Sequence, residues 1–387
     1  MAYGFRDVDG YQALYRVALD GSGNSEQVLA RDDVDIDQLI RIGRQRRVVG
    51  ASYATEKRTI EYLDPELASL ASKLQAALPG KPLIDIVDAS ADERTLLIVA
   101  SSDVDPGMTY LLERDSNRLS PLLPLRDPLV DRPMAPMKPI TFPAADGTQI
   151  PGYLTIPAGA SGPMAAIVLP HGGPGSRDEW GFDWLVQFLA ARGYAVLQPN
   201  FRGSAGYGDA WFGRNGFQEW ETAIGDVNDA GRWLVAEGIA DPARLGIAGW
   251  SYGGYAALQS QVVDPDLYKA VVAIAPVTDL DMVIEEARDY TNFQVVRRFV
   301  GDGPHVRAGS PVNFADRFQA PVLLFHGTED MNVGNQQSRK MEDRLEAAGV
   351  PVRYVEFEGH DHYLDHGKVR RDMLLAIDGF LAENLQK

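Results

Sequence analysis

The chain of 387 residues contains no cysteine. That absence excludes disulfide scaffolds, cysteine-ligated zinc, thiol catalysis and iron–sulfur clusters. The sequence also lacks any run of 18 apolar residues, and its first residues show no basic segment followed by an apolar one. We therefore expect neither a membrane-spanning helix nor a secretory leader, and we expect a cytoplasmic protein.

Positive charge is scarce. Lys and Arg number 37 against 54 Asp and Glu, which gives a formal net charge of −17. Such a surface repels phosphate backbones and anionic lipid headgroups, so we expect neither a nucleic-acid nor a membrane partner. No glycine-rich phosphate-binding motif follows an expected strand, and no nucleotide cofactor is expected. With 45% hydrophobic residues the chain is globular, and its length suits two or three domains.

The first third of the chain has a sequence pattern that is typical of β-strands and turns. Short β-branched and aromatic runs end in turn aspartates spaced 44 and 51 residues apart, after Leu14–Leu19, Arg58–Leu63 and Thr109–Arg114. Such a period is typical of β-propeller blades, of which a closed ring needs at least about four. Residues 1–124 hold only two or three, so we expect a partial β-propeller-like all-β region. Its exposed sheet edges favour a homo-oligomer.

A proline-rich stretch, residues 125–140, is expected to form a linker because proline disrupts helices and central strands. Residues 141–387 then alternate apolar strands with amphipathic helices. Strands are expected at Ala165–Leu169, Tyr194–Gln198, Arg244–Ala248, Ala270–Ala275, Val322–Phe325 and Val352–Phe357. Helices are expected at Phe182–Arg192, Glu219–Glu237, Tyr252–Val263, Asn335–Ala348 and Val369–Leu385. This alternation predicts an α/β fold with a mostly parallel sheet and helices on both faces.

One serine stands in a strand–turn–helix context. The strand expected at Arg244–Ala248 runs into Gly249-Trp250-Ser251-Tyr252-Gly253-Gly254 and then into a helix. In G-x-S-x-G the small residues let the serine occupy a sharp turn with its hydroxyl exposed, which is the nucleophile elbow of α/β-hydrolases. The sequence therefore predicts an α/β-hydrolase domain with Ser251 as its nucleophile.

A serine nucleophile needs a base to remove its proton and a carboxylate to orient that base. Two loops that leave successive expected strands carry such groups, at residues 326–330 (HGTED) and 358–362 (EGHDH). In α/β-hydrolases the acid precedes the histidine in the chain, so the first loop should supply the acid and the second the base. This gives Ser251, Asp330 and His360 as the catalytic residues. The alternatives are Glu329 for the acid, and His362 or His326 for the base.

The developing oxyanion needs two preorganised donors. The backbone N–H of Tyr252, directly after the nucleophile, is the first. The second should come from the glycine-rich loop 171–175 (HGGPG), which directly follows the expected strand Ala165–Leu169. A separate possibility is a metal site built from the histidines at 360, 362 and 366. Because that tract lacks a His-Glu-x-x-His arrangement, we expect no metal.

Five ordered motifs resemble the prolyl oligopeptidase family of serine peptidases, especially its acylaminoacyl-peptidase-like and dipeptidyl-peptidase-like branches. They are HGGP (171–174), NFRGSAGYG (200–208), GWSYGG (249–254), HGTEDMNV (326–333) and EGH (358–360). The resemblance implies Ser251, Asp330 and His360 as the triad. It also implies the Gly173 backbone N–H as the second oxyanion donor, because a histidine stands at 171 where dipeptidyl-peptidase-like members carry a tyrosine. Arg202 and Asp226 match scaffold positions of the family.

The expected function is therefore a serine hydrolase that cleaves peptide bonds, in oligopeptides or acylaminoacyl peptides, through an acyl-enzyme. A carboxylesterase with the same triad is the alternative, since peptide and ester cleavage share the nucleophile and the oxyanion hole. Family members carry a complete propeller that filters substrates by size, and residues 1–124 fall short of one. We accordingly expect Ser251 to accept substrates larger than short peptides.

Overall fold

The computed structural model describes all residues except 79, 214 and 387, the last two of which fall in the expected catalytic domain. The chain divides into two compact units. The first comprises Met1–Lys138 with Glu179–Ala191 and Gly206–Ala210, and the second comprises Pro139–Asp178, Arg192–Ala205 and Trp211–Lys387. Two segments that follow the expected linker in the chain therefore belong to the N-terminal unit.

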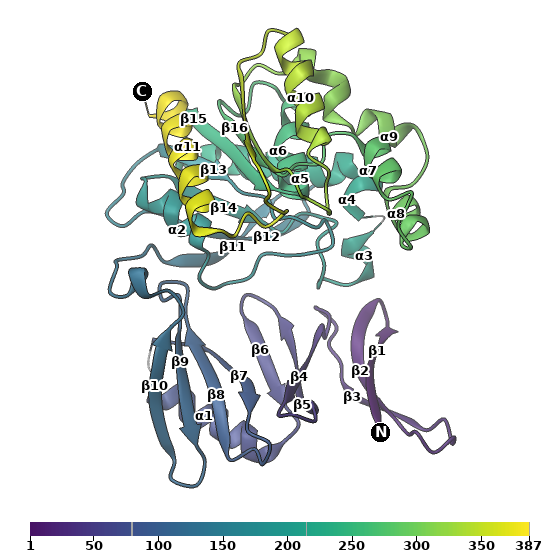
Figure 1. Ribbon diagram of the computed structural model, residues 1–387, viewed down its shortest axis with the longest axis vertical. Helices are drawn as coiled ribbons and strands as arrows, with labels where there is room; N and C mark the ends of the chain where they lie inside the picture. Colours follow the sequence, from purple (N-terminus) through teal and green to yellow (C-terminus); the bar gives the residue numbers. More distant parts are fainter. Residues whose placement is uncertain (79, 214, 387) are drawn as a thin grey trace. The chain divides into compact units, whose positions relative to one another are not determined.

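The first unit contains three antiparallel sheets within its described residues (Figure 1). Their strands are β1 (Ala2–Val8), β2 (Tyr11–Val17) and β3 (Ser25–Leu29); β4 (Gln38–Ile42), β5 (Arg47–Ala54) and β6 (Arg58–Tyr62); and β7 (Leu83–Ala89), β8 (Thr95–Ser101), β9 (Met108–Glu113) and β10 (Arg118–Pro124). Three small antiparallel sheets in succession confirm a partial β-propeller-like region.

Helix α1 (Pro65–Ala77) interrupts this all-β pattern between β6 and β7. Asp64 caps it by accepting hydrogen bonds from the Glu66 and Leu67 amides, and Pro65 occupies its first turn, where no amide donor is needed. The apolar face of α1 buries Leu67 and Leu74 in the same cluster as Ile98 of β8. The unit also contains the 3-10 helix η1 (Asp127–Leu129) and helix α2 (Trp184–Ala191).

The second unit is built on an eight-stranded sheet of order β11-β12-β14-β13-β15-β16-β17-β18. Its strands are β11 (Met137–Pro143), β12 (Gln149–Thr155), β13 (Met164–Val168), β14 (Ala195–Pro199), β15 (Ala240–Trp250), β16 (Val271–Ile274), β17 (Val322–Gly327) and β18 (Val352–Phe357). β12 pairs antiparallel with β14, and the strands from β14 to β18 are parallel. This confirms the predicted mostly parallel sheet.

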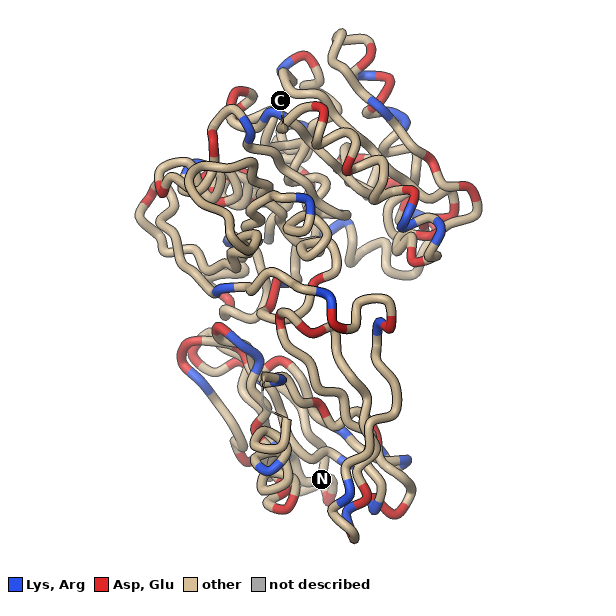
Figure 2. The backbone as a smooth tube through the Cα atoms, turned by 90° about the vertical axis from the view of Figure 1, so that its left-hand side faces the viewer, with Lys and Arg blue, Asp and Glu red and all other residues tan. Residues whose placement is uncertain are grey.

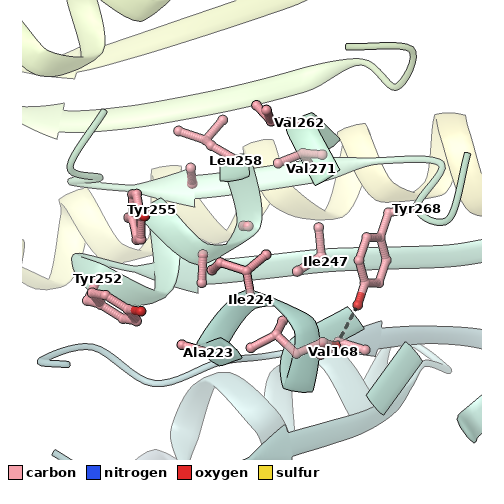
Figure 3. Packing of buried hydrophobic residues seen from close by; sticks show 14 of the residues in the cluster. Val168, Ala223, Ile224, Ile247, Tyr252, Tyr255, Leu258, Val262, Tyr268 and Val271 are labelled. Carbon is pink, nitrogen blue, oxygen red and sulfur yellow. Dashed lines mark hydrogen bonds between the residues drawn. The ribbon is translucent and has the colours of Figure 1, made fainter. Parts of the chain in front are cut away.

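Helices cover both faces of this sheet. The helical elements are α3 (Asp209–Phe212, divided between the two units), α4 (Asn215–Gln218), α5 (Trp220–Ala236), α6 (Tyr252–Val263), α7 (Leu280–Glu286), α8 (Phe293–Val300), α9 (Pro304–Ala308), η2 (Pro311–Arg317), α10 (Gln336–Ala347) and α11 (Gly367–Leu385). Figure 3 shows α5 and α6 packed over Ile247 and Val271, in the main hydrophobic cluster. On the opposite face, a side chain at Gly246 would meet Leu385 of α11 at 2.8 Å. Successive residues of β15 thus point to opposite faces, which explains why its interior is apolar throughout.

Candidate active site

Ser251 lies between β15 and α6 with φ 59° and ψ −119°, a strained backbone conformation for a residue with a side chain. The neighbouring glycines make this turn possible. A Cβ at Gly249 would lie 2.1 Å from the Gly253 carbonyl oxygen, and one at Gly253 would lie 2.1 Å from the Pro170 carbonyl oxygen. Both positions therefore exclude side chains, and the glycines of the motif are required by close backbone approach.

Tyr252, the residue after the serine, is anchored through its side chain. Tyr252 is fully buried, and its hydroxyl donates to the Gly216 carbonyl oxygen over 2.8 Å. Burial raises the pKa of this hydroxyl well above its usual range, so it remains a donor. As the first residue of α6, Tyr252 has a backbone N–H without an acceptor inside the helix. This N–H is the predicted first oxyanion donor.

The glycine-rich loop after β13 lies beside the serine. A Cβ at Gly172 would be 3.2 Å from the Trp250 carbonyl oxygen and 3.5 Å from the Ser251 Cβ. Gly173 has φ +122°, which strongly favours glycine, and a Cβ there would be 2.8 Å from the Gly175 amide nitrogen. The loop that carries the predicted second donor, the Gly173 N–H, therefore passes close to Ser251.

His171 anchors this loop. Its Nδ1 lies 2.7 Å from the Gly172 carbonyl oxygen and its Nε2 lies 2.8 Å from the Ser204 hydroxyl, while its ring stacks on Phe201. Burial, which outweighs the hydrogen bond to Gly172, lowers the pKa of His171 to about 4. The imidazole is therefore neutral near pH 7, and because a carbonyl oxygen can only accept, Nδ1 is the ring nitrogen that carries the proton.

Asp330 is paired with His362, which the sequence offered as an alternative base. His362 Nδ1 lies 2.6 Å from Asp330 Oδ2, and both side chains are buried. The other carboxylate oxygen accepts the backbone N–H groups of Asn332 and Val333 at 2.8 and 2.9 Å. Burial alone would raise the pKa of Asp330, but hydrogen bonds from His326 and His362 outweigh it and hold that pKa well below its usual range.

The structure joins His362, and not the predicted His360, to Asp330. The His360 carbonyl oxygen accepts the Glu329 amide over 2.9 Å, which fixes the backbone of residue 360 against the β17 loop. The ring of His360 instead neighbours His366, with centroids 5.7 Å apart. Two residues later the His362 carbonyl accepts the indole N–H of Trp250, the residue before Ser251, over 3.0 Å. The loop thus reaches Asp330 at residue 362, and not at residue 360 as predicted.

The loops after β17 and β18 are locked together by close backbone contacts. The Thr328 amide donates to Phe357, and the Gly359 amide donates to the Thr328 hydroxyl. A Cβ at Gly327 would lie 2.1 Å from the His360 carbonyl oxygen. Neither Trp250 nor Thr328 was identifiable from the sequence as a contributor to this arrangement, because their partners lie far away along the chain. Glu329, the alternative acid, contributes its amide to the His360 carbonyl.

The other residues singled out from the sequence, Arg202, Asp226 and His326, contact neighbouring side chains. Arg202 binds Asp226 through Nε and a terminal nitrogen, at 2.9 and 2.7 Å, as the scaffold interpretation expects. His326 is completely buried behind Asp330. Within the described residues, no group of three His, Asp or Glu side chains is arranged to hold a metal ion. In the same part of the chain, no helix combines the length and apolarity needed to cross a membrane.

Comparisons with known proteins identify a family. The sequence model of the prolyl oligopeptidase family matches residues 180–387, more than half of the chain. Dipeptidyl aminopeptidase BIII of Pseudoxanthomonas mexicana is 29% identical over 98% of this chain, and dipeptidyl peptidase family member 6 of Caenorhabditis elegans is 29% identical over 90%. This chain spans only 58% and 53% of these two relatives.

Solved structures have the same fold. A puromycin-hydrolyzing peptidase of Mycobacterium tuberculosis aligns with 99% of this chain and 60% of its own, with a TM-score of 0.82 and 23% identity. The acylaminoacyl peptidase of Pyrococcus horikoshii aligns with 100% of this chain and 61% of its own, with a TM-score of 0.77 and 21% identity.

Proposed function

Since the chain belongs to the prolyl oligopeptidase family, we propose that it is a serine hydrolase that cleaves peptide bonds through Ser251, His362 and Asp330. The single observation that carries this assignment is the 2.6 Å hydrogen bond between His362 Nδ1 and Asp330 Oδ2. The Trp250 indole holds the backbone of His362, and Trp250 directly precedes the strained turn of Ser251. A base with its own carboxylate next to an elbow serine is the arrangement that acyl transfer requires.

In this mechanism His362 Nε2 removes the proton from Ser251 as its hydroxyl oxygen attacks the substrate carbonyl carbon. Asp330 keeps the Nδ1 proton of His362 in place and stabilises the imidazolium that forms. The backbone N–H groups of Gly173 and Tyr252 stabilise the oxyanion. His362 then protonates the leaving amine. In the second half of the reaction His362 removes a proton from water as the water oxygen attacks the acyl-enzyme carbonyl carbon, and it then returns that proton to Ser251.

A fluorophosphonate probe tests the nucleophile directly. Wild-type protein should be labelled in a time-dependent reaction, and Ser251→Ala should lose labelling and turnover while it keeps its circular dichroism spectrum. Ser116→Ala, which alters an exposed turn serine, should label at the wild-type rate. Labelling that persists in Ser251→Ala would contradict the assignment.

The class of substrate needs a second comparison. Relatives are named for release of dipeptides and for release of acylated amino acids. Paired peptide substrates with a free or an acetylated amino terminus, each as an amide and as an ester, separate these activities from each other and from simple ester cleavage. Hydrolysis of the ester without measurable hydrolysis of the matched amide would replace the peptidase proposal by a carboxylesterase.

A further inference from the structure

A second histidine, His326, lies against the far side of the acid. It is one of the last residues of β17 and has no exposed surface. Its Nε2 lies 2.8 Å from the Val333 carbonyl oxygen and 3.2 Å from Asp330 Oδ2, the same oxygen that accepts the His362 proton. The catalytic role proposed for Ser251, His362 and Asp330 makes no use of this residue.

The surrounding groups determine which nitrogen of His326 carries the proton. A carbonyl oxygen can only accept, so Nε2, facing Val333, must be the N–H nitrogen. Nδ1 is then the acceptor for the hydroxyl of Ser338 in α10, 2.8 Å away. The opposite tautomer would turn a lone pair toward a carbonyl and a carboxylate at once. Ser338 therefore stabilises the tautomer that presents a positive N–H edge to Asp330.

We propose that His326 is a positioning residue that holds Asp330 ionised and aimed at His362 through its Nε2–H, and thereby sets the pH at which His362 becomes a base. This inference rests on the proposed function. Other titratable groups that face this arrangement are His362 itself, from the loop after β18, and the partly buried Glu286 of α7, which accepts the Gly334 amide over 3.3 Å. Helix α10 contributes the neutral Ser338.

The direction of the effect follows from electrostatics. The positive edge of His326 offsets part of the charge that Asp330 presents to His362. Without that edge the carboxylate stabilises the His362 imidazolium more strongly, so the pKa of His362 rises. The acidic limb of kcat/KM, which reports loss of the proton from the free enzyme's base, then moves to higher pH. A residue that merely fills space would lower the amount of folded protein without moving this limb.

Two amide substitutions at residue 326 separate the effect of the hydrogen-bond donor at the Nε2 position from the effect of side-chain volume. In His326→Asn the amide reaches only the position of Nδ1, so it retains the Ser338 contact and loses the donor to Asp330, whereas in His326→Gln the amide reaches the position of Nε2. We expect His326→Asn to raise the acidic limb by roughly half a pH unit or more and to lower kcat about tenfold with little change in KM. His326→Gln should restore most of both values. The exposed His366→Gln serves as the control for loss of a histidine.

Nuclear magnetic resonance makes the test independent of turnover. The pKa of His362, followed by its ring proton resonances, should rise in His326→Asn and, by a smaller amount, in Ser338→Ala, which leaves the tautomer less constrained. If His326→Asn fails to fold, Ser338→Ala carries the test alone. An unchanged His362 pKa in the folded variants would overturn the role of His326. Failure of the fluorophosphonate reaction would instead overturn the proposed function, whatever the resonance shows.

Discussion

His360 and His362 stand two residues apart in one loop, yet only His362 is bonded to Asp330. We expect His362→Ala to lower kcat/KM by about four orders of magnitude or more, because the serine loses its base. His360→Ala should stay within roughly threefold of wild type, since the structure uses its backbone carbonyl rather than its ring in the site. Steady-state kinetics on one substrate measures both, and equal losses would contradict the assignment of the base.

The acid is tested in the same way. Asp330→Asn should lower turnover by about 10⁴-fold, because an amide can neither fix the Nδ1–H tautomer of His362 nor stabilise the imidazolium. Glu329→Gln leaves the Glu329 amide free to bond His360 and should cost less than about tenfold. Thermal melts of both variants serve as the folding control. A reversed order of effects would place the acid at residue 329.

His171 gives stability a pH dependence. Its pKa is about 4 in the folded chain against 6.5 when exposed, so the unfolded chain binds the extra proton between these values. The stabilisation is complete above pH 6.5 and is lost as the pH falls toward 4. From about pH 7.5 to about pH 5 the loss should be about 2 kcal/mol of unfolding free energy. Urea unfolding should show this loss in wild type and a flatter profile in His171→Gln; parallel profiles would contradict it.

Some features of the site are encoded in a local sequence motif, and others depend on contacts between distant segments. The strained turn at Ser251 was predictable because the glycines that permit it are close to Ser251 in the chain, so the motif itself indicates the geometry. The choice between His360 and His362 depends on where the loop turns, and hydrogen bonds from Glu329 and Trp250 decide that. Such contacts join loops of different strands and leave no local pattern. The short motif therefore left the partner of Asp330 open between two histidines of one loop.

At the scale of elements, the turn between β15 and α6 is expected to tolerate no added methyl group. Gly253→Ala would force a Cβ to 2.1 Å from the Pro170 carbonyl oxygen, displacing either the elbow or the oxyanion loop. We expect it to destabilise the fold by several kcal/mol, or to leave a folded protein that reacts with fluorophosphonate at least about tenfold more slowly.

Gly225→Ala is the matched control for that substitution. Gly225 lies inside α5, and no heavy atom lies within 4 Å of the place that an alanine methyl group would take. Alanine should therefore stabilise the helix by up to about 1 kcal/mol. Denaturant unfolding and the labelling rate measure both variants. Wild-type behaviour in Gly253→Ala would show that the close approach at the elbow is not restrictive.

Strands with a continuous run of strand-forming residues were predictable, whereas a proline-containing edge strand and the shortest helices were not. The strands β13, β14, β16 and β17 are largely apolar and buried because helices cover both faces of the sheet, and α6 and α10 lie where helices were expected. β11 escaped prediction because it contains prolines, which an edge strand accepts where a central strand cannot. Helices α7 to α9, of five to eight residues each, are too short to show helical periodicity.

At the scale of the whole molecule, charge is the property that the sequence reports most directly. Figure 2 shows acidic and basic positions distributed over both units, and the sum of these charges is −17. Many of the arginines are already paired with carboxylates, among them Arg47 with Glu93 and Arg202 with Asp226. The excess acidic charge is therefore what an approaching substrate meets at long range.

This charge predicts a salt dependence of substrate capture. For a peptide substrate with a cationic side chain, kcat/KM should fall roughly two- to fivefold as ionic strength rises from about 20 to about 300 mM, because screening weakens attraction to the acidic molecule. A neutral substrate with the same scissile bond should change little, and an anionic one should improve. Since the chemical step takes place after capture, kcat should stay constant for all three. Identical salt responses of the cationic and anionic substrates would mean that charges close to Ser251, rather than the net charge, control access.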